Sequence, residues 1–131
     1  MSGYANDTPA ELNKSETAAL IAASKVNGTK VYNRKGDSLG SIYDVMLNKQ
    51  NGQVTYAVMS FGGFLGMGEN YHPVPWKKLE YSPQHGGYVV DLDKQQLTAA
   101  PAYRLTDAPD WTGGTYSATV DRYYSGLPVV R

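Results

Sequence analysis

The amino-acid sequence predicts a mainly β protein, a small antiparallel β-barrel or sandwich with short helical turns and a C-terminal helix. Three observations lead to this fold class. Short runs rich in β-branched and aromatic residues recur through the middle of the chain, as is typical of strands. Turn-forming stretches that contain glycine separate these runs at residues 34–37, 49–52 and 84–87. A helical apolar pattern is found near the C-terminal end.

The centre of the predicted barrel is a hairpin with a glycine-rich tip. Residues 53–61 form a strand in which both alternating sets of side chains are apolar, so both of its faces are expected to be buried. Residues 62–68 follow, with four glycines. A second strand spans residues 69–74 and ends at Pro75 and Trp76, where the rigid proline predicts a corner.

The strands before this hairpin are predicted at residues 30–33 and 39–48. In the longer one the alternation of apolar side chains slips by one residue. A β-bulge near Tyr43 and Asp44, or burial of both faces, would account for the slip. Residues 17–23 are ambiguous, because their alanines favour a helix while Leu20 and Ile21 could form a short strand.

Downstream of the hairpin, residues 80–81 and 88–92 are predicted to form two further short strands. Asp93 and Gln96 have the spacing of a capping box, in which each side chain accepts from the backbone of the other. One helical turn that carries Leu97 is therefore expected to follow, with Asp93 as its cap.

The C-terminal part is expected to form an extension with one helix. Residues 104–114 have a linker-like composition, and a helix is predicted over residues 115–124. Its apolar side chains fall on one face, at Tyr116, Val120, Tyr123 and Leu127. So short a helix must dock on another surface, either the chain's own barrel or a second subunit. The expected organisation is thus a flexible segment (1–17), a barrel (18–103) and an extension (104–131).

Composition argues against several functional classes. Twelve basic and twelve acidic residues are interleaved and leave no net charge, so the basic stripe of a nucleic-acid-binding protein is missing. Without cysteine the chain can form neither a disulfide framework nor a thiolate metal site. No apolar run is long enough for a membrane span, and no signal peptide is recognised. We expect a cytoplasmic protein, or a periplasmic one if a signal peptide has been removed.

Several stretches, in this order, carry a family resemblance: residues 28–33 (GTKVYN), 36–45 (GDSLGSIYDV), 51–58 (NGQVTYAV), 61–69 (FGGFLGMGE), 73–76 (PVPW) and 97–101 (LTAAP). Together they resemble the PRC-barrel family, the small β-barrel of the photosynthetic reaction-centre H subunit and of the ribosome-maturation factor's C-terminal domain. The glycine-rich stretch and the tail are similar to those of free-standing bacterial members. The resemblance implies a compact barrel used as a docking module.

The resemblance does not carry the functions of those two proteins. The H subunit has a membrane-spanning helix ahead of its barrel, and the maturation factor has a preceding barrel. Neither has a counterpart in this sequence.

The glycine-rich loop, residues 62–68, has two interpretations. Nucleotide binding is disfavoured, because Tyr71 stands where a dinucleotide fingerprint needs glycine and Glu69 where a phosphate loop needs lysine. In the first interpretation the glycines allow a tight crossover, which makes structural anchors of Gly62, Gly63, Gly66 and Gly68. In the second the loop is an interaction surface formed with Tyr71 by Phe64, Leu65 and Met67. Either the chain's own C-terminal helix or a second subunit could cover it. We expect a second subunit, because short barrel edges also favour pairing of identical chains.

The remaining polar residues give no catalytic or metal-binding pattern. His72 and His85 lie in different hairpins and lack the spacing of metal ligands. Asp91 is expected to face solvent and Asp93 to cap a helix, and no serine lies on a nucleophile elbow. The sequence therefore predicts no enzyme activity, no metal and no cofactor.

Aromatic residues are expected to stabilise the barrel. Pro75 and Trp76 are predicted structural anchors, and Trp76→Ala is expected to cost on the order of 3–5 kcal/mol if the indole is a core anchor. The eleven tyrosines are expected to line the core and the surface, because a tyrosine can bury its ring and keep its hydroxyl in water. Stacking on a ligand is the alternative for some of them.

Two functional hypotheses follow. The first is a non-enzymatic protein-interaction module, expected to form a homodimer with an otherwise unidentified protein partner. The alternative is a sensor that binds a small ligand or an anion in the barrel mouth. An interaction module exposes apolar surface, whereas a sensor has a pocket with convergent polar groups.

Overall fold

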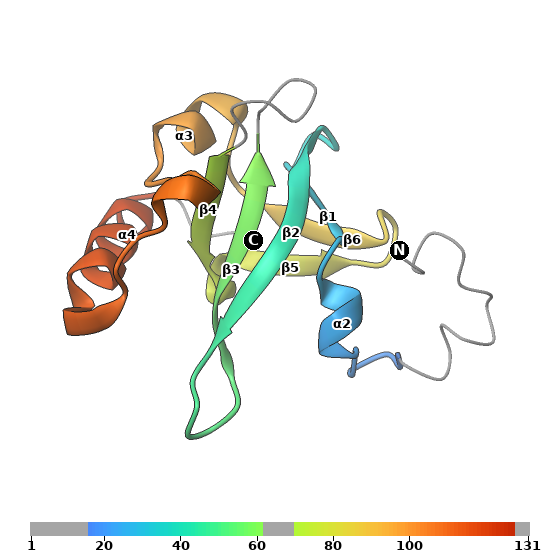
Figure 1. The fold of residues 1–131 in the computed structure, drawn as a ribbon. Coiled ribbons are helices and arrows are strands. Elements are labelled where there is room, and N and C mark those ends of the chain that lie inside the picture. Colours follow the sequence, from blue (N-terminus) through green and yellow to red (C-terminus); the bar gives the residue numbers. More distant parts are fainter. Residues whose placement is uncertain (1–15, 62–69, 128–131) are drawn as a thin grey trace.

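The computed structural model describes residues 16–61 and 70–127, which form a six-stranded mixed sheet with short helices around it. The sheet is curled into a half-barrel, with β2, β3 and β4 in one layer and β5 and β6 behind them (Figure 1). The strand order is β4-β3-β2-β1-β6-β5. The bounds are β1 (Lys30–Tyr32), β2 (Ser38–Leu47), β3 (Val54–Phe61), β4 (Asn70–Pro75), β5 (Leu79–Ser82) and β6 (Gly87–Val90).

The predicted mainly β fold is confirmed, with one difference in strand direction. The pairs β1–β2, β2–β3, β3–β4 and β5–β6 are antiparallel, as expected, but β1 and β6 run parallel. The first four strands form a continuous meander, and the 3₁₀ turn η3 (Trp76–Lys78) then redirects the chain into the β5–β6 hairpin. That hairpin returns to the open side of β1, where β6 has the same direction as β1.

β3 is buried on both faces, as the sequence predicts. Tyr56, Ala57, Val58 and Met59 are all buried. Ala57 and Met59 belong to the main core, which they share with Val31 of β1, Tyr88 and Val90 of β6 and Val74 of β4. Tyr56 and Val58 lie on the opposite face, where the Tyr56 ring packs against Trp111 of the C-terminal segment.

The irregular apolar pattern of β2 has the predicted cause. The register between β2 and β3 shifts between Ile42 and Asp44, which confirms a β-bulge at Tyr43. The β2–β3 turn is closed by a hydrogen bond of 2.8 Å from the Asn48 backbone N–H to the Gln53 carbonyl. The turn thus sets the pairing of the two longest strands.

The helices are short except at the C-terminal end: α2 (Ala23–Val26), α3 (Lys94–Ala99), the 3₁₀ turns η4 (Leu105–Asp107) and η5 (Thr112–Gly114), and α4 (Thr115–Ser125). The capping box of α3 is present, with Gln96 N–H donating to Asp93 Oδ1 at 2.7 Å. The ambiguous residues 17–23 are neither all helix nor a full strand. An isolated bridge joins Glu16 to Ile21, and α2 begins at Ala23.

α4 docks on the chain's own sheet, the first of the two predicted alternatives. Val120 and Tyr124 are buried, and the hydroxyl of Tyr56 on β3 donates to Asp121 of α4 at 2.8 Å. The Tyr123 hydroxyl donates to the Gln96 carbonyl of α3 at 2.6 Å. Tyr124 was not part of the predicted apolar face, because a helix packed between a sheet and α3 buries a wider stripe than one row of side chains.

The outer edge of β4 is closed to further strands. Every second residue of β4 has its backbone N–H and C=O groups on the side away from β3. These residues are Tyr71, Pro73 and Pro75. The two prolines have no N–H to donate. Tyr71 exchanges backbone hydrogen bonds of 2.8 and 3.0 Å with Tyr103. The expected edge-to-edge pairing of identical chains is therefore disfavoured at this edge.

Gly40 in β2 provides a test of the strand packing. A Cβ added there would lie 2.0 Å from the Ser60 carbonyl oxygen, at φ +153°, whereas Gly52 has φ +78° with no atom within 4 Å. We expect Gly52→Ala to lower the free energy of unfolding by about 1–2 kcal/mol through its backbone conformation alone. Gly40→Ala should lower it by more than about 4 kcal/mol, because β2 and β3 must separate. Equal losses in urea unfolding would contradict this packing.

Candidate functional site

The predicted interaction loop is only partly within the described residues. Phe64, Leu65 and Met67 lie outside them, as do the glycines Gly62, Gly63, Gly66 and Gly68. Tyr71 lies within them, on β4, and it is buried rather than exposed. Its ring nevertheless contacts a group of more exposed aromatic side chains, and this group is the candidate functional site.

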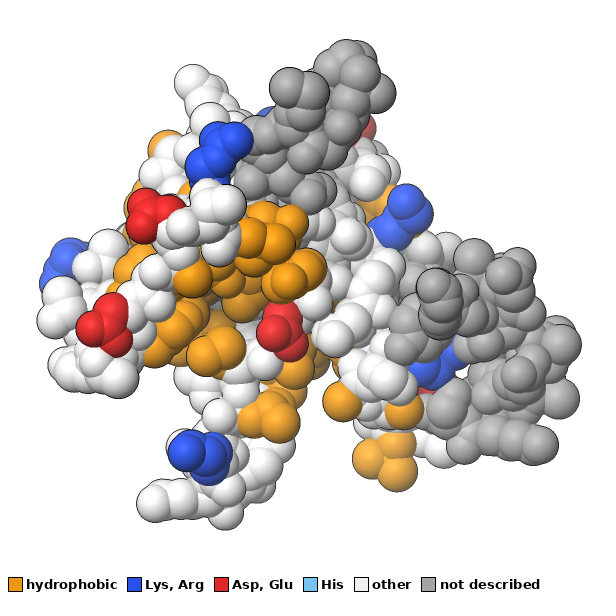
Figure 2. Space-filling model, in the orientation of Figure 1, with side chains coloured by type: hydrophobic (Ala, Val, Ile, Leu, Met, Phe, Trp, Pro, Cys, Tyr) orange, Lys and Arg blue, Asp and Glu red, His pale blue; other side chains and the backbone are white. Residues whose placement is uncertain are grey.

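These aromatic residues lie on the outer side of β2, β3 and β4. The Tyr43 and Tyr71 ring centroids are 4.8 Å apart, and those of Tyr71 and Tyr103 are 5.9 Å apart. Trp111 packs edge-on against Tyr116 at 5.0 Å, and burial together with Tyr103 raises the pKa of Tyr116 to about 12. We call these five residues the aromatic face. Figure 2 shows apolar side chains gathered over this part of the sheet and the C-terminal segment.

Local structure brings residues far apart in the sequence to this face. The bulge in β2 lets Tyr43 reach the Tyr71 ring across the sheet. The antiparallel bridge to Tyr71 fixes Tyr103 beside β4. Trp111 lies just before η5. Its ring contacts Tyr116 of α4, and its ring centroid lies 5.5 Å from that of Tyr56 on β3. The face is therefore held by backbone pairing at one end and by packing of the helix at the other.

Exposure and charge distinguish this face from the core. Tyr43 is 45% exposed, while Tyr103, Trp111 and Tyr116 are half-buried. Burial raises the pKa of Tyr103, and Tyr43 and Asp44 add to the effect, so its phenol stays neutral at neutral pH. Asp44 is an exposed carboxylate beside this face. The arrangement offers aromatic contact area rather than a charged or reactive group.

Trp76, a predicted core anchor, has a mixed environment. The indole is half-buried and packs against the main core, with its ring edge-on to Tyr88 of β6 at 5.2 Å. It also lines a cleft beside α4. Pro75 is buried at the end of β4. The size of the loss from Trp76→Ala stays a prediction.

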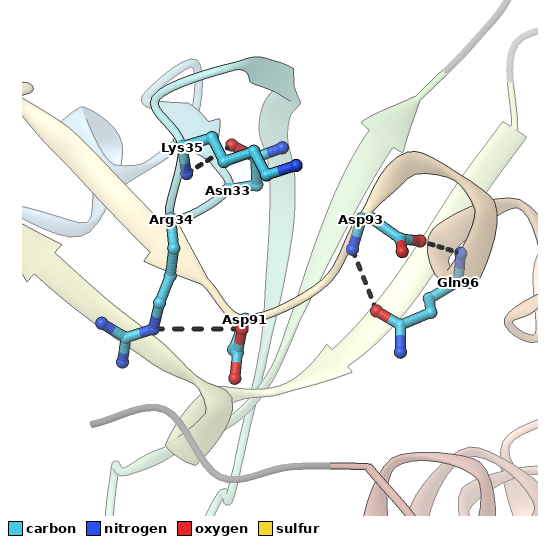
Figure 3. Close-up of polar contacts among 6 residues, drawn as sticks. All are labelled: Asn33, Arg34, Lys35, Asp91, Asp93 and Gln96. Carbon is cyan, nitrogen blue, oxygen red and sulfur yellow. Dashed lines mark hydrogen bonds and ion pairs between the residues drawn. The ribbon is translucent and has the colours of Figure 1, made fainter.

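The acidic candidates have structural partners. Asp91 lies 3.9 Å from the Arg34 Nε, and Asp93 holds Gln96 in the capping box (Figure 3). Figure 3 shows the two carboxylates engaged with different partners rather than with a shared substrate position. Within residues 16–61 and 70–127, no three His, Cys, Asp or Glu side chains come together as metal ligands. The described residues thus offer neither a paired-carboxylate site nor a metal site.

The two histidines differ sharply in their surroundings. His72 on β4 is 1% exposed, and among the described residues neither of its ring nitrogens has a hydrogen-bonding partner. Burial lowers the pKa of His72 to about 4, with the Pro101 backbone opposing the shift. His85 is exposed, and its Nδ1 lies 2.9 Å from the Ser82 hydroxyl. His72 is therefore a buried structural residue.

The environment of His72 predicts a pH dependence of stability. The pKa of His72 is about 6.5 in the unfolded chain and about 4 in the folded chain. Between these two pH values the imidazole binds a proton in the unfolded chain but not in the folded chain. The free energy of unfolding should therefore fall as the pH falls through this range. His72→Leu should remove this part of the slope in urea unfolding, and His85→Leu should retain it. Equal slopes in the wild type and His72→Leu would contradict burial of a neutral imidazole.

Sequence reasoning found Tyr71 but missed the four other residues of the aromatic face. Tyr43 was noted only as part of a bulge, and Tyr103, Trp111 and Tyr116 belong to the C-terminal part of the chain. The high tyrosine content was the available signal. It could not show which tyrosines meet, because the contacts join residues on β2, on β4 and before α4.

Parts of the chain are similar to known proteins. Residues 19–97 match the PRC-barrel domain family. A protein of Deinococcus radiodurans, named only as an uncharacterized protein, is 28% identical over 100 residues, which cover 75% of this chain and 35% of that protein. The chain thus matches about a third of that relative's length. In residues 16–61 and 70–127, no helix has the length and apolar character to cross a membrane. The matched region spans more than half of the chain, which therefore belongs to the PRC-barrel family, whose domains are generally non-catalytic.

Proposed function

We propose that this protein is a non-enzymatic docking module that associates with a second copy of itself through the aromatic face. The observation that carries the proposal is the exposed Tyr43 ring, which stands on a continuous row of aromatic side chains. A side chain of this size left 45% exposed beside other apolar groups indicates a surface that a partner covers.

The chemistry of the face suits protein contact. Tyrosine and tryptophan are enriched in the centres of interfaces, where they supply large contact areas at low cost in conformational entropy. Leu47, at the end of the same strand as Tyr43, adds exposed apolar area. In Figure 2 the apolar surface is broad and carries few charged side chains, which lie mostly around it.

A second copy is the partner that this chemistry favours. A two-fold interface brings each residue against the same patch of the partner, so the patch must be complementary to itself. Aromatic rings meet this condition because the positive edge of one ring attracts the negative face of another. A surface rich in like charges would repel its own copy, but the aromatic face consists of uncharged side chains.

The proposed mode of association uses the face of the sheet rather than its edge. Pro73 and Pro75 leave the outer edge of β4 without donors at these positions, and Tyr103 already pairs with Tyr71. The association therefore depends on side-chain packing. The acidic and histidine side chains described above have structural roles, which supports a docking function over catalysis.

Tyr43→Ser is expected to weaken self-association without unfolding the protein, because it removes the most exposed ring of the face. We expect a wild-type dimer at high micromolar concentration in sedimentation experiments, and a dissociation constant raised by at least about tenfold in the variant.

Tyr81→Ser is the matched control. Tyr81 lies on β5 and is 42% exposed, close to the 45% of Tyr43, but it is not part of the aromatic face. It should leave the dimer intact. A wild type that is monomeric throughout, or a Tyr43→Ser variant as dimeric as the wild type, would contradict the proposal. Circular dichroism and thermal melting establish that both variants are folded.

A further inference from the structure

A second surface, separate from the aromatic face, has the features of a small-molecule site. It is a cleft of about 950 Å³ between the β2–β3 turn, η3 and the C-terminal half of α4. Its volume lies within the range of small-molecule sites. We call it the lysine cleft, after Lys77 and Lys78, which line it together with Trp76, Asn48, Asn51 and Tyr124.

Lys78 is the feature that most directly indicates a ligand. It lies in η3 and is only 9% exposed, yet no described residue gives its ammonium group a hydrogen bond or an ion pair. Lys77 beside it also has no acidic partner among the described residues. The stem of Lys78 is enclosed while its ammonium group stays accessible, since it is not among the buried side-chain atoms that lack a partner. Two cations without counter-charges in one cleft attract an anion.

The other walls of the cleft offer an apolar surface and further hydrogen-bond donors. Trp76 is half-buried and presents part of its indole to the cleft, where a planar group could stack. Tyr124 also lines the cleft, with its hydroxyl oxygen buried from solvent and without a partner among the described residues. The side-chain oxygens of Asn48 and Asn51 accept backbone hydrogen bonds within the turn, at 2.9 Å from Gln50 and Gln53. This leaves their side-chain NH₂ groups as donors.

One acidic residue lines the cleft, and it is already engaged. The Asp121 carboxylate accepts a hydrogen bond of 2.8 Å from the Tyr56 hydroxyl. It lies farther than ion-pair distance from both lysines. The balance of charge in the cleft is therefore positive.

From these features we propose that the lysine cleft binds a small molecule that carries a carboxylate or phosphate group on a planar apolar body. Lys77 and Lys78 bind the anionic group, and the Trp76 indole stacks on the planar part. The site uses no residue of the aromatic face. Binding here is therefore independent of the proposed self-association.

Phenyl phosphate and benzoate are suitable probes, with benzamide as the neutral analogue and inorganic phosphate as the anion without a ring. We expect either phenyl phosphate or benzoate to bind in calorimetric titration. The affinity should be at least about tenfold above that of benzamide and of inorganic phosphate, because both contacts are needed. The preferred probe identifies the anionic group. Tyr43→Ser should bind as the wild type does, whatever its state of association.

Lys78→Met keeps the length of the buried stem and removes the charge, so it should weaken binding of the preferred probe by at least about tenfold. Lys35→Met, in an exposed turn away from the cleft, makes the same change in net charge and should leave binding unchanged. Trp76→Phe should weaken binding of the ring-bearing probe more than that of inorganic phosphate. Thermal melting checks that all three variants are folded.

Three outcomes would overturn the proposal. The first is that neither anionic probe binds at probe concentrations up to about 10 mM, well above ordinary small-molecule dissociation constants. The second is that benzamide binds as tightly as the anionic probes. The third is that Lys78→Met binds the preferred probe as tightly as the wild type and Lys35→Met do.

Discussion

The structure depends above all on the burial of both faces of β3. Ala57 and Met59 fill the core that β3 shares with β1 and β6, and this burial holds the two layers of the half-barrel together. Tyr56 and Val58 are buried on the opposite face and need a cover of their own. The C-terminal segment covers Tyr56 there, through Trp111 and α4.

This arrangement gives the C-terminal extension a defined role. α4 and the residues before it complete the fold at one end of the sheet, while the Tyr43 end of the same outer face keeps an exposed ring. The closed edge of β4 directs contacts to the face, because Pro73 and Pro75 withhold backbone donors there. The packing of the C-terminal segment and the proposed docking thus use neighbouring parts of one surface.

Local sequence signals predicted the elements well. The bulge at Tyr43, the capping box of Asp93 and Gln96, and the helix now seen at Thr115–Ser125 all follow from interactions between residues close in sequence. The parallel pairing of β1 with β6 does not, because it depends on where the η3 corner sends the chain. The aromatic face and the lysine cleft were missed for the same reason: their members come from distant segments. The mixed position of Trp76 shows that one residue can face both core and cleft, which alternation along a strand cannot reveal.

The central claim is that the aromatic face mediates contact between identical chains. Its most direct test is the concentration dependence of the backbone amide NMR spectrum, recorded from the low micromolar to the high micromolar range. The account predicts shift or intensity changes concentrated around Tyr43, Tyr71 and Tyr103, with β5 and β6 unchanged. A spectrum that does not change with concentration, or changes confined to β5 and β6, would contradict it.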